Sequence, residues 1–208
     1  MFTFLRRTHL SGRQARAVEK TLQQIRAYRR SRFRVLACID GSPEALETVR
    51  MAARLAPTED CDIIILYVRP ADHGLQSGGL QVKLARESML EAGIDLPGVS
   101  DLGRALEVLK EQGIDPTAWP KEVVHAEAWD AAGDNKVEYR SPHGRSVVLK
   151  LKTAPDIASG ILDQYELGPY NLMILGEPSH WRSELRFFFG VAGIVQQVAV
   201  MAPCSVLV

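Results

Sequence analysis

An acidic turn follows the first apolar run of the chain. Residues 33–39 are mostly apolar and partly β-branched, which predicts a strand buried on both faces. Asp40, Gly41 and Ser42 come directly after it, and Pro43 opens a stretch with apolar residues at helical spacing. The Ser42 hydroxyl is suited to cap that helix. A carboxylate at a strand end, beside a helix start, predicts a ligand-binding position on an α/β sheet. The alternative is that Asp40 only accepts N–H bonds from the helix start.

A second turn of this kind lies near the end of the chain. Residues 171–175 form an apolar run that leads into Gly176. A polar and aromatic loop follows, then a predicted helix from about Gly190, and finally Ala-Pro-Cys-Ser-Val-Leu-Val over residues 202–208. Gly176 therefore stands at the end of a predicted strand, as Asp40 does.

The elements between these turns favour a parallel sheet. Residues 61–68 form a second apolar run, and the spacing from the first leaves room for one helix, which makes the two strands parallel. Helical patterns follow near residues 81–92 and 101–112. The order of elements predicts an α/β fold, with a five-stranded, mostly parallel sheet covered by helices on both faces.

Together, the two turns resemble the universal stress protein family. The resemblance rests on strand-Asp-Gly-Ser at one end and on strand-Gly, loop, helix and Ala-Pro-Cys-x-Val-Leu-Val at the other. It covers about residues 33–208, with a middle part that matches poorly. The resemblance implies a Rossmann-like fold, a stress-related regulatory role and a homodimer formed through the strand Val206–Val208. It also implies that the second strand gives backbone contacts to an adenine ring, with Val68 at the matching position.

The family's ATP-binding signature is only partly present. It consists of Gly, two residues, Gly, nine residues, and Gly followed by Ser or Thr. Gly176 matches the first glycine, but Ser179 stands at the second. The third match is either Gly190, one residue late and followed by valine, or Gly193. The resemblance thus implies an adenine nucleotide, ATP or AMP, with Mg²⁺ only alongside it. The implied site comprises Asp40, Gly41, Ser42, Val68, Gly176, Ser179, Gly190 and Gly193.

No catalytic constellation stands out in the sequence. Apart from Asp40, no serine, cysteine or carboxylate pair is placed for nucleophilic or acid–base chemistry. His125 and His143 lack a third metal ligand at useful spacing. We therefore expect a binding protein and not an enzyme. A nucleotide-processing enzyme of the wider adenine-nucleotide-binding superfamily is an alternative that rests on fold analogy alone.

Charge is segregated along the chain although the net charge is zero. Residues 1–34 contain ten Lys or Arg and one acid, a net charge of +9, and the remaining residues carry −9. Residues 12–30 carry apolar side chains on one helical face, namely Ala15, Val18, Leu22 and Ile25. We expect this basic helix to dock on its own domain or on a second subunit. Binding to an anionic membrane or to nucleic acid, or service as a transit peptide, are the alternatives.

The middle of the chain holds an insertion relative to the family plan. Residues 136–152 are rich in β-formers, and residues 141–144 (Ser-Pro-His-Gly) suit a type I turn, so we predict a hairpin. One arm, residues 147–153, continues as the family's central strand, and a helix opens at residues 155–156. Four roles are open for the hairpin: a partner-binding arm, a dimer clasp, a lid over the ligand site, or a cover for the sheet edge. We favour the clasp or the edge cover.

These observations divide the chain into a basic N-terminal helix, residues 1–32, and an α/β domain, residues 33–208, with the insertion at about 115–150. Three cysteines without disulfide or zinc spacing favour a cytoplasmic location. The first functional hypothesis is a non-catalytic, homodimeric stress-response protein that holds an adenine nucleotide at the strand ends. The second is a nucleotide-free interaction or scaffold protein, in which the hairpin and the basic helix bind an unidentified protein partner.

Overall fold

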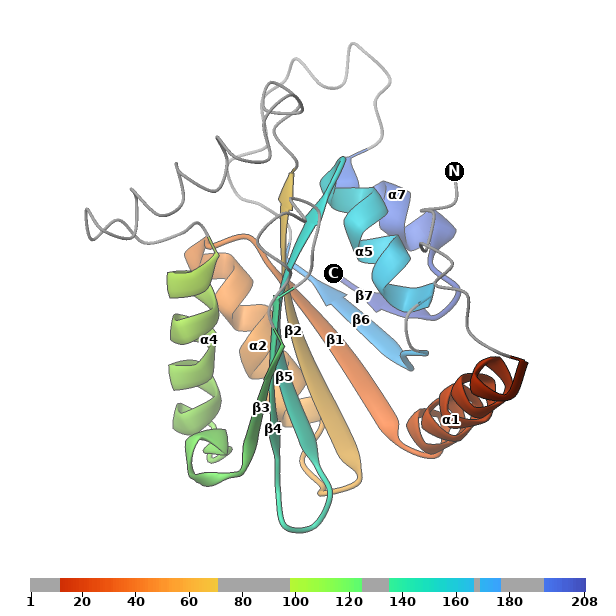
Figure 1. Cartoon of the computed structure of the whole chain (residues 1–208). Helices are drawn as coiled ribbons and strands as arrows, with labels where there is room; N and C mark the ends of the chain where they lie inside the picture. The colour runs from red at the N-terminus through yellow and green to blue at the C-terminus, as the bar shows by residue number, and fades with distance from the viewer. Residues whose placement is uncertain (1–11, 71–97, 125–134, 167–168, 177–192) are drawn as a thin grey trace, which may run out of the picture.

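The apolar runs of the sequence become parallel neighbours in a single sheet (Figure 1). The computed structural model describes residues 12–70, 98–124, 135–166, 169–176 and 193–208. Among these residues, seven strands follow the order β3-β4-β5-β2-β1-β6-β7. The five mutually parallel strands are β1 (Phe33–Ile39), β2 (Cys61–Pro70), β5 (Ser146–Ala154), β6 (Leu172–Leu175) and β7 (Ser205–Leu207). The predicted parallel α/β sheet is therefore confirmed.

The insertion extends this sheet by two antiparallel strands, so the prediction of five strands is corrected to seven. The hairpin consists of β4 (Asn135–Arg140) and β5, and β3 (Lys121–Val124) pairs with β4 at the edge. At the hairpin turn, Ser141 N donates to Arg145 O at 2.8 Å, and Gly144 N donates to Ser141 O at 3.0 Å. All four residues of β3 are exposed, and a strand that buries neither face leaves no alternating apolar pattern in the sequence.

Five α-helices are described. They are α1 (Gly12–Arg30), α2 (Pro43–Leu55), α4 (Val99–Glu111), α5 (Ile157–Glu166) and α7 (Ile194–Met201), and a short 3₁₀ turn spans Pro116–Ala118. The helix α2 begins as predicted, with Ser42 as its N-cap and Pro43 in its first turn. The helix predicted from about Gly190 corresponds to α7, whose N-cap residue is Gly193; Gly190 itself lies outside the described residues. The helix predicted for residues 81–92 lies outside the described residues.

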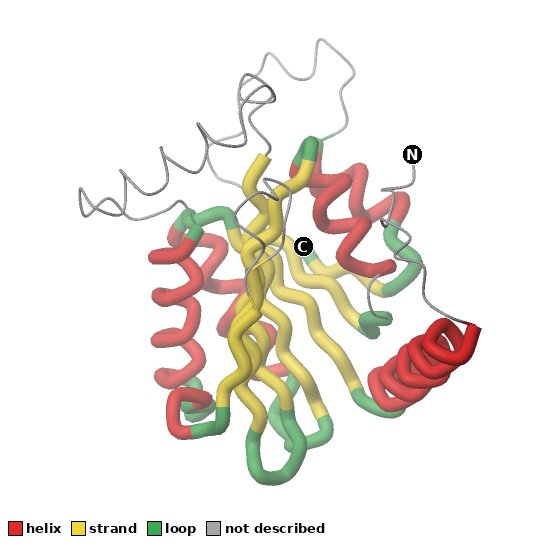
Figure 2. Tube along the Cα trace, in the orientation of Figure 1, coloured by secondary structure: helices red, strands yellow, loops and turns green. Residues whose placement is uncertain are grey.

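Helices cover both faces of the sheet (Figure 2). On the first face, α2 and α4 pack on one apolar cluster, and on the second face α5 and α7 pack on another. The side chains of β5 alternate between the two faces. Val147, Leu149 and Leu151 join the cluster on the first face, whereas Val148 alternates with Lys150 on the second. These two layers fix the strand ends where the site is expected.

The basic helix α1 lies near the amino ends of the strands, on the same side of the sheet as α5 and α7 (Figure 1). Tyr28 Oη donates to Gly144 O in the hairpin turn at 3.2 Å, and the Arg32 guanidinium lies 5.8 Å from the Tyr28 ring centroid. Ile25 and Tyr28 are 41% and 49% exposed, so this helix covers the sheet incompletely. The side chains of Ala15, Val18 and Leu22 lie outside the described part of the structure.

Candidate functional site

Three of the predicted site residues stand in one row at the carboxyl ends of adjacent strands. β1 pairs in register with β2 up to Ile39 and with β6 up to Cys38. Continuing the register by one residue brings Asp40 opposite Val68 and Gly176 opposite Ile39. Because paired strands lie about 4.8 Å apart, Asp40 and Val68 are about 5 Å apart, and Gly176 is level with the residue before Asp40. We call Asp40, Val68 and Gly176 the carboxyl edge.

Asp40 organises the turn that leads into α2. Its Oδ1 accepts hydrogen bonds from Ser42 N at 2.9 Å and from Ser42 Oγ at 2.6 Å. Ser42 Oγ in turn accepts from Ala45 N at 3.1 Å, which caps the helix. Gly41 makes the turn possible with a φ of 87°, a value that side chains disfavour. One carboxylate oxygen therefore holds the turn, while Oδ2 accepts no hydrogen bond from the described residues.

At this edge the relevant part of Val68 is its backbone, because its side chain packs against α5 on the second face of the sheet. A Cβ on Gly160 of α5 would lie only 2.5 Å from Val68 Cγ1, so the Val68 side chain packs into the second face. β1 stops opposite Tyr67, and from Val68 to Pro70 the strand β2 pairs only with β5. On the β1 side, no strand among the described residues pairs with β2 beyond Tyr67. Such a place, where neighbouring strands stop, is where α/β sheets hold ligands.

Gly176 lets β6 end close to the first turn of α2. A Cβ at this position would lie 3.4 Å from Thr48 Cγ2 and 3.5 Å from Ala45 Cα. Gly193 is the N-cap residue of α7, and an added Cβ there would meet nothing within 4 Å. Ser179 and Gly190 lie outside the described residues. The structure thus brings together Asp40, Gly41, Ser42, Val68 and Gly176.

A second carboxylate, which the sequence analysis missed, flanks the Asp40 turn. A Cβ on Gly41 would lie 2.9 Å from Asp101 Oδ2, in the first turn of α4. Arg104 forms an ion pair with Asp101, and Arg104 Nη2 donates to Gly41 O at 3.5 Å. The sequence indicates only that a helix starts after Gly98, which does not show that its first turn lies against Gly41.

Tyr67 lies in the same acidic surroundings. Burial raises the pKa of Tyr67, and the charges of Asp101 and Asp40 raise it further, while Arg69 opposes them. The Tyr67 ring also packs against Gly98, where an added Cβ would lie 2.6 Å from Tyr67 Cδ1. Carboxylates so placed favour ligand groups that donate hydrogen bonds, such as hydroxyl and amino groups, over a chain of phosphates.

Within the described ranges, no group of three or more His, Cys, Asp or Glu residues is arranged to hold a metal ion. No helix in that part of the chain has the length and apolar character needed to cross a membrane. At the carboxyl edge, the described groups are backbone, hydroxyl, carboxylate and guanidinium groups that bind by hydrogen bonds and charge.

Universal stress proteins are among the solved structures that are similar to this chain. The structure of a universal stress protein in complex with cAMP has a TM-score of 0.50 and 14% identity, and the match covers 85% of this chain and 95% of that one. A universal stress protein from Archaeoglobus fulgidus has a TM-score of 0.47 and 12% identity, covering 84% and 91%. A member of the family from Burkholderia pseudomallei has a TM-score of 0.44 and 15% identity, covering 84% and 92%.

The likeness at a TM-score of 0.50 supports the fold, and the family follows from the sequence itself. A search of curated proteins finds no match. The sequence model described as "Universal stress protein family" matches residues 32–208, which include every described strand and all helices except α1. This chain therefore belongs to the universal stress protein family.

Proposed function

We propose that this protein is a non-catalytic regulator that binds an adenine nucleotide at the carboxyl edge. The observation that carries the proposal is the end of β2, which extends past the end of β1 at Val68, beside the Asp40 turn. A purine base has both hydrogen-bond donors and acceptors on its edge, which is what an unpaired strand backbone complements. The crystal structure of a related protein in complex with cAMP is consistent with such a ligand.

The chemistry of the edge favours a mononucleotide such as AMP over ATP. Asp40 and Asp101 place two carboxylates around Gly41, and a triphosphate beside them would need a compensating Mg²⁺. Ser179 replaces a glycine in the phosphate-binding signature, and valine replaces the hydroxyl residue after Gly190. The free Oδ2 of Asp40 suits a ribose hydroxyl or an exocyclic amino group.

We also propose a cytoplasmic homodimer that assembles through β7. This strand pairs with β6 on one side and stands at the end of the sheet order on the other. Exposed apolar side chains continue the open edge onto α7, with Val200, Met201 and Val208 at 79%, 66% and 61% exposure. An unpaired strand edge next to an apolar surface favours pairing with a second copy.

The test is isothermal titration of the full chain with AMP, with cAMP and with ATP plus Mg²⁺. The informative variant is Asp40→Asn, which keeps an oxygen to hold the turn but removes the charge. Asp115→Asn is a matched control, because Asp115 Oδ1 accepts from Thr117 N at 3.0 Å and from Thr117 Oγ1 at 2.6 Å, the same pattern as Asp40. We expect AMP to bind and Asp40→Asn to weaken it about tenfold, the effect of losing one charged hydrogen bond.

Two results would count against nucleotide binding at this edge. One is the absence of both heat and a melting-temperature shift up to millimolar nucleotide. The other is equal affinity in Asp40→Asn, in Gly176→Val and in the Asp115→Asn control. Turnover of ATP, measured as phosphate release, would refute the non-catalytic assignment and support the enzyme alternative.

The interaction-protein hypothesis remains the second candidate, because the structure places its two features side by side. The hydrogen bond from Tyr28 to Gly144 joins the basic helix to the hairpin turn. On the helix, Arg26 and Arg30 are exposed. Salt-dependent binding of an acidic protein, lost when Arg26 and Arg30 become Gln and kept in Asp40→Asn, would favour this function.

A further inference from the structure

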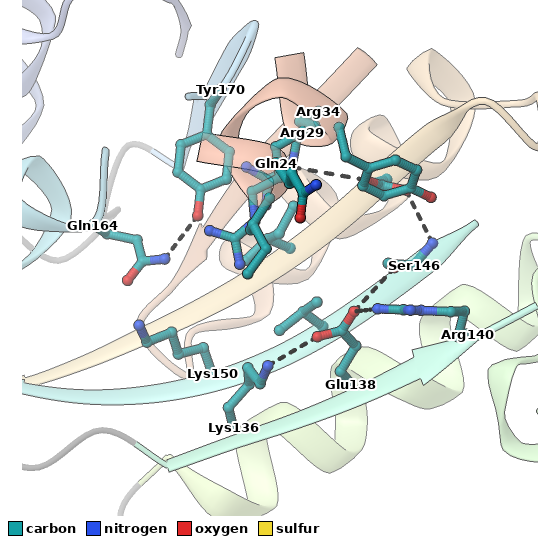
Figure 3. Close-up of a pocket in the computed structure, with 15 residues that line it drawn as sticks. Gln24, Arg29, Arg34, Lys136, Glu138, Arg140, Ser146, Lys150, Gln164 and Tyr170 are labelled. Carbon is teal, nitrogen blue, oxygen red and sulfur yellow. Dashed lines mark hydrogen bonds and ion pairs between the residues drawn. The ribbon is translucent and has the colours of Figure 1, made fainter. Parts of the chain in front are cut away.

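A cavity lies far from the carboxyl edge, between α1 and the second face of the sheet (Figure 3). Its volume is about 510 Å³, which is in the range of small-molecule sites. Arg34, at the start of β1, lines the cavity, whereas Asp40 follows the end of that strand. Six residue-to-residue steps along the strand place the two about 20 Å apart. The cavity is therefore distinct from the site proposed for the nucleotide.

Cationic side chains dominate the walls of the cavity. The cations come from α1 and three strands, namely Arg29, Arg34, Lys136, Arg140 and Lys150, against two acids, Asp62 and Glu138. Hydrogen bonds and ion pairs already engage both acids. Asp62 Oδ1 accepts from Arg32 Nε at 2.8 Å and from Ser146 N at 3.0 Å. Glu138 accepts from Lys136 Nζ at 2.9 Å and from Arg140 Nη2 at 2.8 Å. The formal excess of three positive charges favours an anionic ligand.

Two lysines of this wall face each other across paired strands. Lys136 of β4 stands directly opposite Lys150 of β5 in the antiparallel register. Lys150 is only 8% exposed, and Lys136 donates to Glu138 Oε2 at 2.9 Å. Both lysines line the cavity, so an anion bound there would meet two cationic side chains.

The cavity also holds two buried polar atoms without hydrogen bonds from the described residues. One is Arg34 Nε, which lies 3.8 Å from Asp62 Oδ2 while Nη1 donates to Pro169 O at 2.9 Å. The other is Gln164 Oε1, whose amide Nε2 donates to Tyr170 Oη at 2.7 Å. Both side chains are more than nine-tenths buried. They leave one donor and one acceptor for a ligand. Figure 3 shows Gln164 beside Tyr170.

We propose that this cavity binds the phosphate monoester of a small hydroxylated compound. The excess of positive charge favours a phosphate dianion over a monocarboxylate. Gln164 Oε1 requires a donor such as a hydroxyl group on the ligand. The volume exceeds what inorganic phosphate fills, and apolar side chains of Ile25, Ile64 and Val148 provide a surface for an organic body. Because α1 forms one wall, the ligand also fastens the basic helix to the domain.

The test is isothermal titration of the full chain with glucose 6-phosphate, inorganic phosphate and glucose as probes. We expect glucose 6-phosphate to bind more tightly than phosphate, glucose to give no heat, and added salt to weaken binding. Lys150→Gln should weaken binding about tenfold or more, the effect of losing one charged hydrogen bond. Its control is Lys152→Gln, which removes the next lysine on the same face of β5; this lysine lies 3.8 Å from Asp163 and does not line the cavity.

A second pair of variants keeps the test valid if Lys150→Gln does not fold. Arg29→Gln removes a cavity charge from α1, and Arg26→Gln removes an exposed charge of the same helix that does not line the cavity. Only Arg29→Gln should weaken binding. No heat with glucose 6-phosphate up to about 10 mM, or equal affinity in both variants, would overturn the proposal; weaker millimolar sites are rarely specific. Loss of binding in Asp40→Asn alone would assign the probe to the carboxyl edge, which overturns this cavity but not the nucleotide site.

Discussion

Replacing Glu138 with glutamine should destabilise the domain in a way that depends on pH. Glu138 lies in β4, its side chain is 14% exposed, and it accepts hydrogen bonds from Lys136, Arg140 and Ser146. Burial raises the pKa of Glu138, but the hydrogen bonds and charges of Arg140 and Lys136 lower it from 4.5 to about 2. The net effect favours the ionised carboxylate in the folded state.

This pKa sets the size and the direction of the effect. A fall from 4.5 to about 2 corresponds to about 3 kcal/mol of folding free energy. The side chains of Lys136 and Arg140 are 28% and 58% exposed, so solvent screens part of this, and we expect about 2 kcal/mol at pH 7. Because folding lowers the pKa, the stabilisation is complete above about pH 4.5 and is lost as the pH falls towards 2.

The assay is urea unfolding of the wild type and of Glu138→Gln at pH 7, 5, 4 and 3, with stability compared at each pH. The difference between the two proteins should be largest at pH 7 and should shrink below about pH 4.5. Glu122→Gln is the matched control, since Glu122 is exposed on β3 and stands directly opposite Glu138. Removing that like charge should be neutral or slightly stabilising. A loss of under about 0.5 kcal/mol, or one independent of pH, would refute the reasoning.

Three further predictions concern packing, assembly and a buried charge. Gly160→Ala should cost about 1 to 3 kcal/mol in urea unfolding, because the added Cβ would lie 2.5 Å from a side-chain carbon of β2. Gly103→Ala should instead stabilise the domain by about 0.5 to 1 kcal/mol, since the added Cβ meets nothing within 4 Å. If both substitutions change the stability in the same direction, the prediction is wrong. Val200→Glu with Val208→Glu should convert a dimer to a monomer in sedimentation, and a wild-type monomer would contradict the proposed assembly. Asp62→Ala should lower the free energy of unfolding by about 3 to 5 kcal/mol, because it leaves the buried Arg32 and Arg34 without this carboxylate partner. Chemical unfolding measures this, and a loss below about 1 kcal/mol would contradict the prediction.

The sequence predicted the elements that are strongly apolar or clearly capped. The bounds of β1 and α1 agree with the prediction, and α2 begins at Pro43 after the Ser42 cap. The hairpin turn at residues 141–144 was also predicted, because proline and glycine occupy turn positions there. The strand β3 was not predicted as a separate edge strand, since its four exposed residues carry no alternation.

At the candidate site, the sequence predicted positions along the chain but not neighbours in space. Asp40, Val68 and Gly176 were recognised from strand ends and from the family resemblance, and the strand register then placed them in one row. Asp101 was missed, because nothing in a helical pattern shows that its first turn will lie against Gly41. Ser179 and Gly190 lie outside the described residues, and their roles stay predictions.

The sequence alone determined the family, the parallel sheet and the chemistry of the Asp40 turn, because these depend on local runs, caps and spacing. Only the tertiary structure decided which charges meet. Lys136, Lys150, Arg34 and Gln164 are spread over 131 positions, and none belongs to a recognisable motif. They share one cavity because strand pairing and the docking of α1 and α5 bring them to one face of the sheet. Such contacts join residues distant in sequence, so local patterns carry no signal of them.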